Sequence, residues 1–175
     1  MFNCFFPDKY INSTYSIDFE ALYNSGYRGI IFDIDNTLVT HGDPADERAI
    51  ELISKLKEIG FRILFLSNNK EPRVKMFNDA VNCQYIFKAD KPAKKGYLKA
   101  MELLNTNKND TLFVGDQIFT DVWGAKRIGI FSILVKPIDK REEIQIVLKR
   151  RLESIVLKSY KRFCEKNNKV FLEEY

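Results

Sequence analysis

Histidine and cysteine, the residues that most often bind transition metals, are scarce in this 175-residue sequence: it has one histidine and three cysteines. Cys4, Cys83 and Cys164 are odd in number, lie far apart and form no C-x-x-C pair. This spacing argues against a disulfide framework or a zinc site and indicates reduced thiols in a cytosolic protein. His41 lies in a loop with Gly, Asp and Pro, where we expect a solvated side chain.

Long hydrophobic runs are also missing, since none approaches the roughly 20 residues that a membrane span needs. The N-terminus lacks a basic region, and Asp8 and Lys9 interrupt its apolar stretch, so it makes a poor signal peptide. We therefore expect a cytoplasmic protein. The length, with 45% hydrophobic and 30% charged residues and no linker or repeat, predicts one globular domain over 1–175.

What the chain does contain is a regular alternation of strand and helix patterns. Strands are expected at 30–34, 61–66, 85–87, 111–114 and 130–135, and helices at 46–59, 72–80, 94–104 and 120–128. Apolar positions such as Ile50 and Ile53 mark the inner face of the first helix, and Gly60 ends it. Short connections between alternating strands and helices predict an α/β fold, doubly wound and Rossmann-like, with a mostly parallel five-stranded sheet.

Polar residues follow the expected strands. Asp33 and Asp35 end the first strand, where two buried charges are costly unless a cation compensates them. In doubly wound folds, ligands bind beyond the carboxyl ends of the strands. The residues at these ends are Asp33, Asp35, Thr37, Ser67, Asn68, Asn69, Asp90, Lys91, Asp116 and Asp121. Carboxylates, a hydroxyl and a lysine at one rim predict a site for Mg²⁺ and a phosphoryl group.

Each of these residues also has a simpler interpretation. Asp116 and Asp121 could be acids at a helix N-terminus, favoured there by the helix dipole. Ser67 could be a turn or cap residue. Lys91 competes with Lys88, Lys94 and Lys95, and is preferred because of its spacing and the adjoining Pro92.

Four short motifs resemble those of the haloacid dehalogenase (HAD) phosphatases. Asp33-Ile34-Asp35-Asn36-Thr37-Leu38 resembles motif I, Ser67 motif II, Lys91 motif III, and Gly115-Asp116-Gln117-Ile118-Phe119-Thr120-Asp121 motif IV. A phospho-receiver domain would place its acceptor after the third strand instead. The longer matches F-D-I-D-N-T-L-V, S-N-N and G-D-Q-I-F-T-D-V-W-G-A resemble the YqeG-type HAD IIIA phosphatases, which are similar to mitochondrial phosphatidylglycerophosphate phosphatases.

The resemblance implies a Mg²⁺-dependent phosphomonoesterase that forms an aspartyl-phosphate. Asp33 would be the nucleophile, and Asp35 the general acid and then the base. Asp116, the Asp33 side chain and the Asp35 backbone carbonyl would hold the metal, with Asp121 acting more indirectly. The substrate phosphate would be bound by Thr37, Ser67, Asn68 and Lys91. A phosphate monoester carries about two negative charges, so a carboxylate nucleophile needs the metal and the lysine to screen them.

HAD phosphatases usually carry a cap domain, and this sequence has no room for one after motif I or after the third strand. We therefore expect a HAD core without a cap domain and with an open rim. An open rim suits bulky substrates, or an oligomeric neighbour could act as the lid. The resemblance implies dephosphorylation of phosphatidylglycerophosphate; the alternatives are a soluble phosphatase for a small metabolite or a nucleic-acid end, and a non-catalytic binding module.

The two ends of the chain bear on the choice of substrate. All the net charge of +4 lies in residues 136–175, which hold 11 basic and 7 acidic side chains. A helix is expected at about 139–166, with Asp139 as N-cap and Glu142 at its third position. Its apolar side would carry Ile144, Val147, Leu148, Leu152, Ile155, Val156 and Phe163, and its basic side Lys149, Arg150, Lys158, Lys161 and Arg162.

The expected C-terminal helix either packs on the sheet with a solvated face or presents a basic surface to anionic lipid. The aromatic N-terminal segment 1–20 either anchors at a membrane interface or covers an edge of the sheet. The expected partners are thus a phosphorylated substrate, with a lipid phosphate as one option, and a membrane surface in peripheral contact. Nucleic acid is not expected as a partner, and the oligomeric state is left open.

Overall fold

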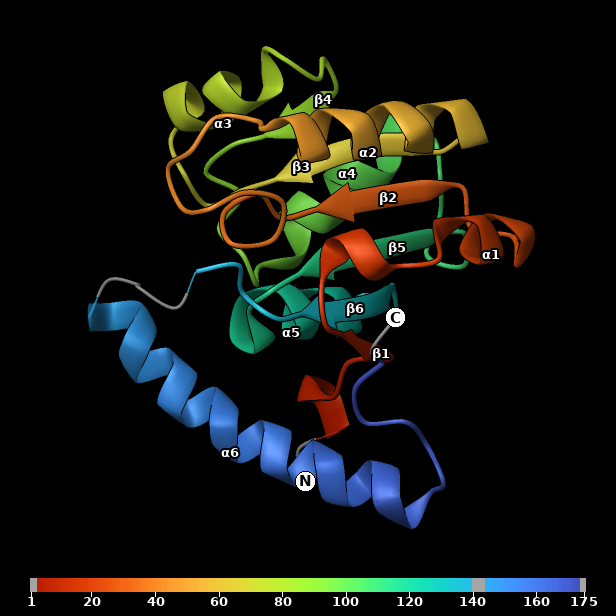
Figure 1. Ribbon diagram of the computed structural model, residues 1–175, viewed down its shortest axis with the longest axis vertical. Helices are drawn as coiled ribbons and strands as arrows, with labels where there is room; N and C mark the ends of the chain where they lie inside the picture. Colours follow the sequence, from red (N-terminus) through yellow and green to blue (C-terminus); the bar gives the residue numbers. More distant parts are fainter. Residues whose placement is uncertain (1–2, 140–143, 174–175) are drawn as a thin grey trace.

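Six parallel strands form a single twisted sheet in the order β1-β6-β5-β2-β3-β4 (Figure 1). The structure is a computed structural model that describes residues 3–139 and 144–173, the side chains of 144–150 excepted. The strands are β1 (Lys9–Ile11), β2 (Gly29–Phe32), β3 (Arg62–Leu66), β4 (Gln84–Ile86), β5 (Thr111–Gly115) and β6 (Phe131–Val135). The expected α/β class is confirmed, with a sheet of six strands instead of five.

Six α-helices and three short helical turns complete the described structure. The helices are α1 (Phe19–Asn24), α2 (Glu47–Ile59), α3 (Glu71–Asn78), α4 (Lys94–Leu104), α5 (Trp123–Lys126) and α6 (Ile144–Lys166). The turns are η1 (Asn3–Phe5), η2 (Thr14–Ser16) and the π-helical η3 (Ile118–Val122). The helix expected at 120–128 is therefore two elements, η3 followed by α5, and α1 was not expected from the sequence.

The strand that the sequence pattern did not reveal is β1, which pairs with β6 at one edge of the sheet. Its three residues are too few to show an apolar alternation, and they follow Pro7 and Asp8. Tyr10 in this strand and Phe6 just before it are buried in one cluster with residues of α6. The N-terminal segment therefore covers the sheet edge, which was one of its two expected roles.

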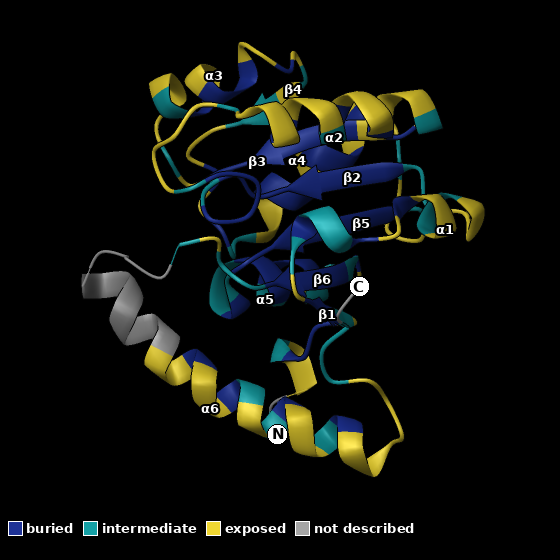
Figure 2. Ribbon diagram, in the orientation of Figure 1, coloured by how far each residue is buried: buried dark blue, intermediate teal, exposed yellow. Residues whose placement is uncertain are grey.

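Alternate residues of the buried strands face opposite sides of the sheet, as the twofold repeat of a strand requires. In β2, Ile30 and Phe32 pack with α1, α2 and α3, whereas Ile31 packs with α4 and α5. Helices therefore cover both faces of the sheet, which makes the near-continuous apolar runs of its strands favourable. Figure 2 shows the central strands β6, β5, β2 and β3 largely buried and the outer faces of the helices exposed.

Helix α2 begins and ends where the sequence predicts. The Asp46 side chain accepts a hydrogen bond from the Ala49 amide as N-cap. Gly60 ends the helix with φ of 109°, a conformation that favours glycine. The expectation for Ile50 was wrong, because its side chain is 38% exposed while Ile53 is buried.

Helix α6 lies apart from the helices that cover the two faces of the sheet, and it packs across β1 and η3 (Figure 1). Its inner face holds Val156, Tyr160 and Cys164 against Ile118 and Val122. None of the helices in the described part of the chain is long and apolar enough to span a bilayer.

The division of α6 into an apolar and a basic side was partly wrong. Val156, expected on the apolar side, is buried, whereas Leu152 and Ile155, expected on the same side, are 53% and 56% exposed. The expected capping box at Asp139 and Glu142 involves residues 140–143, which lie outside the described residues, as do the side chains of 144–150.

The order of the strands reverses beside β2, which has β3 on one side and β5 on the other. The chain builds β3 and β4 outward and then returns through α4 to β5. The carboxyl ends of β2 and β5 therefore form the crevice at which ligands bind in such sheets. The connections after β2 (33–46) and after β4 (87–93) hold no helix, so no cap domain is evident in the described chain.

Candidate active site

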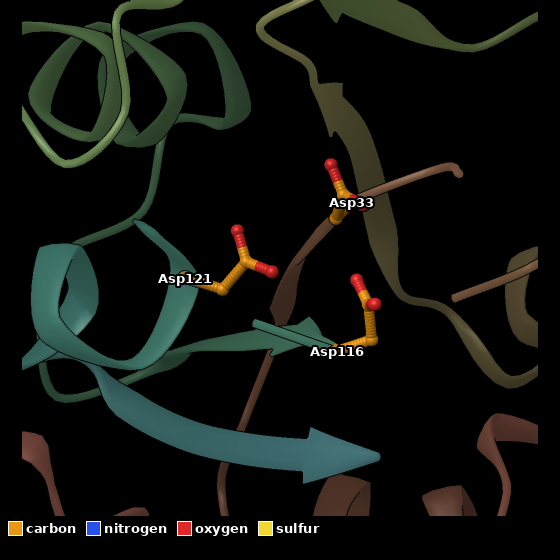
Figure 3. A group of neighbouring side chains, drawn as sticks. All are labelled: Asp33, Asp116 and Asp121. Carbon is orange, nitrogen blue, oxygen red and sulfur yellow. The ribbon is translucent and has the colours of Figure 1, made fainter. Parts of the chain in front are cut away.

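Three buried carboxylates meet in the crevice between the ends of β2 and β5 (Figure 3). Asp33 follows β2, Asp116 follows β5, and Asp121 lies in η3. One oxygen from each lies within 4.8 Å of the others, and the three residues are 7%, 2% and 1% exposed. The structure therefore brings together three acids that are up to 88 residues apart in the sequence.

Parallel pairing of the two strands sets this geometry. The Asp33 amide donates to the Val114 carbonyl at 2.9 Å, which continues the β2–β5 ladder into the site. The Gln117 amide donates to Asp121 Oδ2 at 3.0 Å and closes the turn that carries both other acids. Gly115 is required in this turn, because a Cβ there would collide with the Asp121 carboxylate.

Lys91 is the cation of the cluster. Its Nζ donates to Asp33 Oδ1 at 2.5 Å and to Asp121 Oδ1 at 2.8 Å. The other lysines considered from the sequence, Lys88, Lys94 and Lys95, are exposed. The Asn68 side chain fixes the Lys91 backbone by accepting from its amide at 2.7 Å and donating to its carbonyl at 3.2 Å.

The pKa values of Asp33 and Lys91 are both raised, but for different reasons. Burial raises the pKa of Asp33 to about 7; Lys91 opposes this shift and Asp121 adds to it. Burial alone would lower the pKa of Lys91, but Asp121 and Asp33 together hold it above its ordinary value. The ammonium is therefore charged at neutral pH.

The donor set fits a divalent metal ion. Three buried carboxylates face one ammonium, so the cluster carries more negative than positive charge in a site shielded from water. Hard oxygen donors of this kind are those that Mg²⁺ and similar ions prefer. Both oxygens of Asp121 are already hydrogen-bonded within the protein, one to Lys91 and the other to the Gln117 amide. The Asp121 carboxylate is therefore less suited to bind a metal ion directly.

Asp35 is held in a separate set of contacts. Arg73 donates to Asp35 Oδ1 through Nε at 3.1 Å and Nη2 at 2.8 Å. Asn69 Nδ2 donates to Asp35 Oδ2 at 2.8 Å, and the Gly42 amide donates to Oδ1 at 2.9 Å. His41 is half-exposed, as expected for a loop residue, yet its Nδ1 lies 3.6 Å from Asp35 Oδ1.

The hydroxyl groups expected to bind phosphate are buried beside the carboxylates. Thr37 Oγ1 donates to Asp116 Oδ1 at 3.3 Å. Ser67, at the end of β3, is 2% exposed, and its Oγ accepts from the Asn69 amide at 3.1 Å. Both residues therefore lie at the carboxyl edge of the sheet with the acids.

The N-terminal segment supports the loop after β2. The hydroxyl of Thr14 donates to the Thr37 carbonyl at 2.7 Å, and that of Tyr15 donates to the Leu38 carbonyl at 2.5 Å. Burial and the nearby Asp46 raise the pKa of Tyr15 to about 12, so its hydroxyl keeps its proton for this bond. Turn η2 thereby holds the backbone of the residues that follow Asp35.

Sequence reasoning missed Arg73 and the bond from Asn69 to Asp35. A signal for Arg73 does exist, because a cation in the first turn of a helix opposes the helix dipole and therefore needs a local acid. Its Nη1 is buried and has no hydrogen-bond partner in the described structure. The sequence also could not show that Lys91, and not Lys88, Lys94 or Lys95, is the buried lysine, because burial depends on the fold.

Comparisons with known proteins identify the family to which the chain belongs. A hydrolase family described as haloacid dehalogenase-like hydrolase matches residues 40–129. The chain is 36% identical to a protein described as "Probable phosphatase YqeG" from Bacillus subtilis (strain 168), over 90% of this chain and 92% of that protein. It is 29% identical to "Phosphatidylglycerophosphate phosphatase 1, chloroplastic/mitochondrial" from Arabidopsis thaliana, over 83% of this chain and 45% of that protein.

Solved structures share the fold at low sequence identity. An uncharacterized protein from Listeria monocytogenes serotype 4b superposes with a TM-score of 0.51, at 18% identity, covering 67% of this chain and 86% of that one. At this identity the likeness concerns the fold alone.

Proposed function

Because this chain belongs to the haloacid dehalogenase-like hydrolases and is a phosphatase of that family, we propose that it is a Mg²⁺-dependent phosphomonoesterase that works through an aspartyl-phosphate. The observation that carries this proposal is the buried cluster of Asp33, Asp116, Asp121 and Lys91 at the switch point of the sheet. A dianionic phosphate can approach such a cluster only where cations offset the carboxylates.

The metal would be held by Asp33 and Asp116, together with the backbone carbonyl of Asp35. Its chemistry there would be to neutralise the charge that develops on the phosphoryl oxygens. Asp121 would act through Lys91, since its Oδ1 accepts from that ammonium at 2.8 Å. The four acids expected as metal residues thus take different parts in the proposed site.

In the first step, one Asp33 carboxylate oxygen attacks phosphorus and the bond to the leaving alcohol oxygen breaks. Lys91, already in contact with Asp33, would stay close to the phosphoryl oxygens and offset their charge. Thr37 and Ser67 would offer hydroxyl groups to the same oxygens. Asn68 would act indirectly, because its side chain is used to hold the Lys91 backbone.

Asp35 would handle the protons. It gives a proton to the departing alkoxide in the first step and takes one from the water that attacks the aspartyl-phosphate in the second. The second step releases inorganic phosphate and returns Asp33 to its carboxylate form. Arg73 is a positioning residue for this work, because its two donors fix the Asp35 carboxylate.

Replacing Arg73 with alanine is expected to lower kcat for an alkyl phosphate by about 100-fold, since a misplaced acid loses most of its benefit. The loss should be much smaller for p-nitrophenyl phosphate, whose leaving group departs without a proton. Steady-state kinetics with both substrates measure the difference. Lys75→Ala is the matched control, because Lys75 is an exposed cation on the same helix α3. Equal losses on both substrates would contradict the role given to Arg73.

We infer further that the substrate is an anionic phospholipid phosphate, with phosphatidylglycerophosphate as the leading candidate. The Arabidopsis relative is named for that activity. No cap domain is evident in the described chain, so a bulky headgroup can reach the crevice. The exposed face of α6 (Figure 2) carries the apolar side chains of Leu152 and Ile155. It also carries the cations Arg151, Lys158 and Arg162.

A face of this composition suits the surface of an anionic membrane, where apolar side chains enter the interface and cations meet lipid headgroups. The protein would then work in the cytoplasm, in peripheral contact with the membrane. The N- and C-terminal segments would belong to the same single domain as the sheet, since their aromatic residues pack together.

The substrate proposal is tested by letting phosphatidylglycerophosphate in anionic mixed micelles compete with soluble phosphomonoesters. We expect the lipid to be preferred. The double variant Ile155→Glu with Lys158→Glu should lower binding to anionic vesicles by about tenfold or more, while hydrolysis of an aryl phosphate is unchanged. The matched control is Leu98→Glu with Lys99→Glu, a similar exposed pair on α4.

Two outcomes would contradict the lipid assignment. The first is a preference for a soluble phosphomonoester, which would favour a phosphatase for small metabolites. The second is equal vesicle binding by the wild-type protein, the α6 variant and the α4 control.

A further inference from the structure

Glu153 is a buried acid on α6 that contacts the backbone of the site. It is the only acidic residue between Ile144 and Cys164, and its side chain is 4% exposed. Its Oε1 accepts hydrogen bonds from the amides of Ile118 at 2.7 Å and Phe119 at 3.4 Å. A carboxylate buried on the inner face of a helix is costly unless such donors satisfy it.

The two amides belong to the first turn of η3, the segment that carries Asp121 and follows Asp116 directly. The residue before this turn, Gln117, makes no side-chain cap. The first amides of a helical turn lack partners within it, and an acid is the acceptor they favour. Glu153 supplies that acceptor from an element 35 residues further along the chain.

Apolar packing between α6 and η3 surrounds this contact. Val156, Tyr160 and Cys164 of α6 share one buried cluster with Ile118 and Val122 of η3. Glu153 and Asp116 also line the same cavity of about 110 Å³ between α6 and the end of the sheet. The position of α6 is therefore linked to the position of both acids in this turn.

We propose that Glu153 is a positioning residue for the metal site, which sets the spacing of Asp116 and Asp121 by capping the turn between β5 and α5. This rests on the proposed function, because it assumes that these acids serve a metal ion. Residues outside the direct ligands commonly change metal affinity by about 10- to 100-fold when they are replaced. The C-terminal helix would thus support the active site as well as being a candidate membrane contact.

Removing residues 139–175 would take away Glu153 and expose the cluster that contains Val156 and Tyr160. A truncated protein would therefore lose activity whether or not α6 touches a membrane. Substitutions on the exposed face of α6, in the full chain, separate the two roles.

The test measures Mg²⁺ binding directly, by isothermal titration and by the Mg²⁺-induced shift in Tm. Glu153→Leu should weaken Mg²⁺ binding by about tenfold or more, and amide hydrogen exchange over residues 117–122 should become faster. Glu153→Gln keeps an acceptor oxygen and should stay within about threefold of the wild-type affinity. Val156→Ala is the matched control: it removes packing in the same cluster and touches neither amide.

Wild-type affinity in Glu153→Leu, or an equal loss in Val156→Ala, would overturn the inference. If Glu153→Leu does not fold, Glu153→Asp takes its place, because the shorter side chain withdraws the carboxylate from both amides. It should weaken Mg²⁺ binding in the same direction, and unchanged binding would overturn the inference as well. A wild-type protein that binds no Mg²⁺ would overturn the proposed function, and this inference with it.

Discussion

Asp33→Asn is expected to reduce Mg²⁺-dependent hydrolysis of an aryl phosphate by about 10⁴-fold or more, because the amide cannot form the aspartyl-phosphate. The substitution keeps the size of the side chain and removes one of three neighbouring buried negative charges. Phosphate release by the purified protein, with Mg²⁺ and with excess EDTA, measures the effect. The wild-type protein should lose its activity in EDTA to a similar degree.

The fold should survive this substitution. Burial of an ionised carboxylate is unfavourable, and Asp33 lies in a cluster with one ammonium for three acids. The Tm of the metal-free Asp33→Asn protein should therefore equal or exceed that of the wild-type protein. Full activity in a folded Asp33→Asn protein would rule out the covalent mechanism.

Lys91→Met is expected to abolish activity and also to destabilise the protein, in contrast to Asp33→Asn. The side chain of Lys91 is 3% exposed and bonds two acids. Removing the cation of a buried pair leaves uncompensated charge and typically costs about 3–5 kcal/mol. For a chain of this length that corresponds to a fall in Tm of roughly 10 °C, measured by thermal unfolding without metal.

Lys95→Met is the control for this prediction, since Lys95 is an exposed lysine close to Lys91 in the sequence. It should change neither Tm nor kcat by a measurable amount. The double variant Lys91→Met with Asp33→Asn should recover part of the lost stability, because it removes one of the unpaired acids. A Lys91→Met protein as stable as the wild type would contradict the contacts described for this lysine.

The strand and helix pattern of the core could be read from the sequence. Buried strands such as Ile30–Phe32 are apolar throughout because helices cover both faces of the sheet. The limits of α2 followed from local rules, an acid that caps its first turn and a glycine that ends it. Such signals act over a few residues, and a single sequence displays them directly.

The strand β1 and the orientation of α6 could not be read in the same way. Three residues at a sheet edge carry no periodic pattern, and their pairing with β6 joins segments more than 120 residues apart. Several faces of α6 contain apolar side chains, so the sequence did not show that Val156 turns inward and Ile155 outward. The side of α6 that is buried depends on its packing against η3 and β1.

The residues of the candidate site also fall into two groups, those that the sequence indicates and those that only the structure reveals. The acid pair that ends the first strand, and the lysine and acids that follow later strands, were identifiable because parallel strands deliver their ends to one edge. The roles of Arg73 and Glu153 were not. Arg73 contacts Asp35 and Glu153 contacts two amides of η3, both far away in the sequence, and no spacing rule connects the positions.

By itself, the sequence determined the class of fold of this phosphatase and which strand-end residues are candidates for its chemistry. Apolar periodicity, helix caps and strand-end acids depend only on residues that are close together in the sequence. The tertiary structure alone decided which lysine is buried between Asp33 and Asp121, what holds Asp35, and that Glu153 of the C-terminal helix contacts the turn between Asp116 and Asp121. Those facts depend on burial and long-range contact, which exist only once the chain has folded.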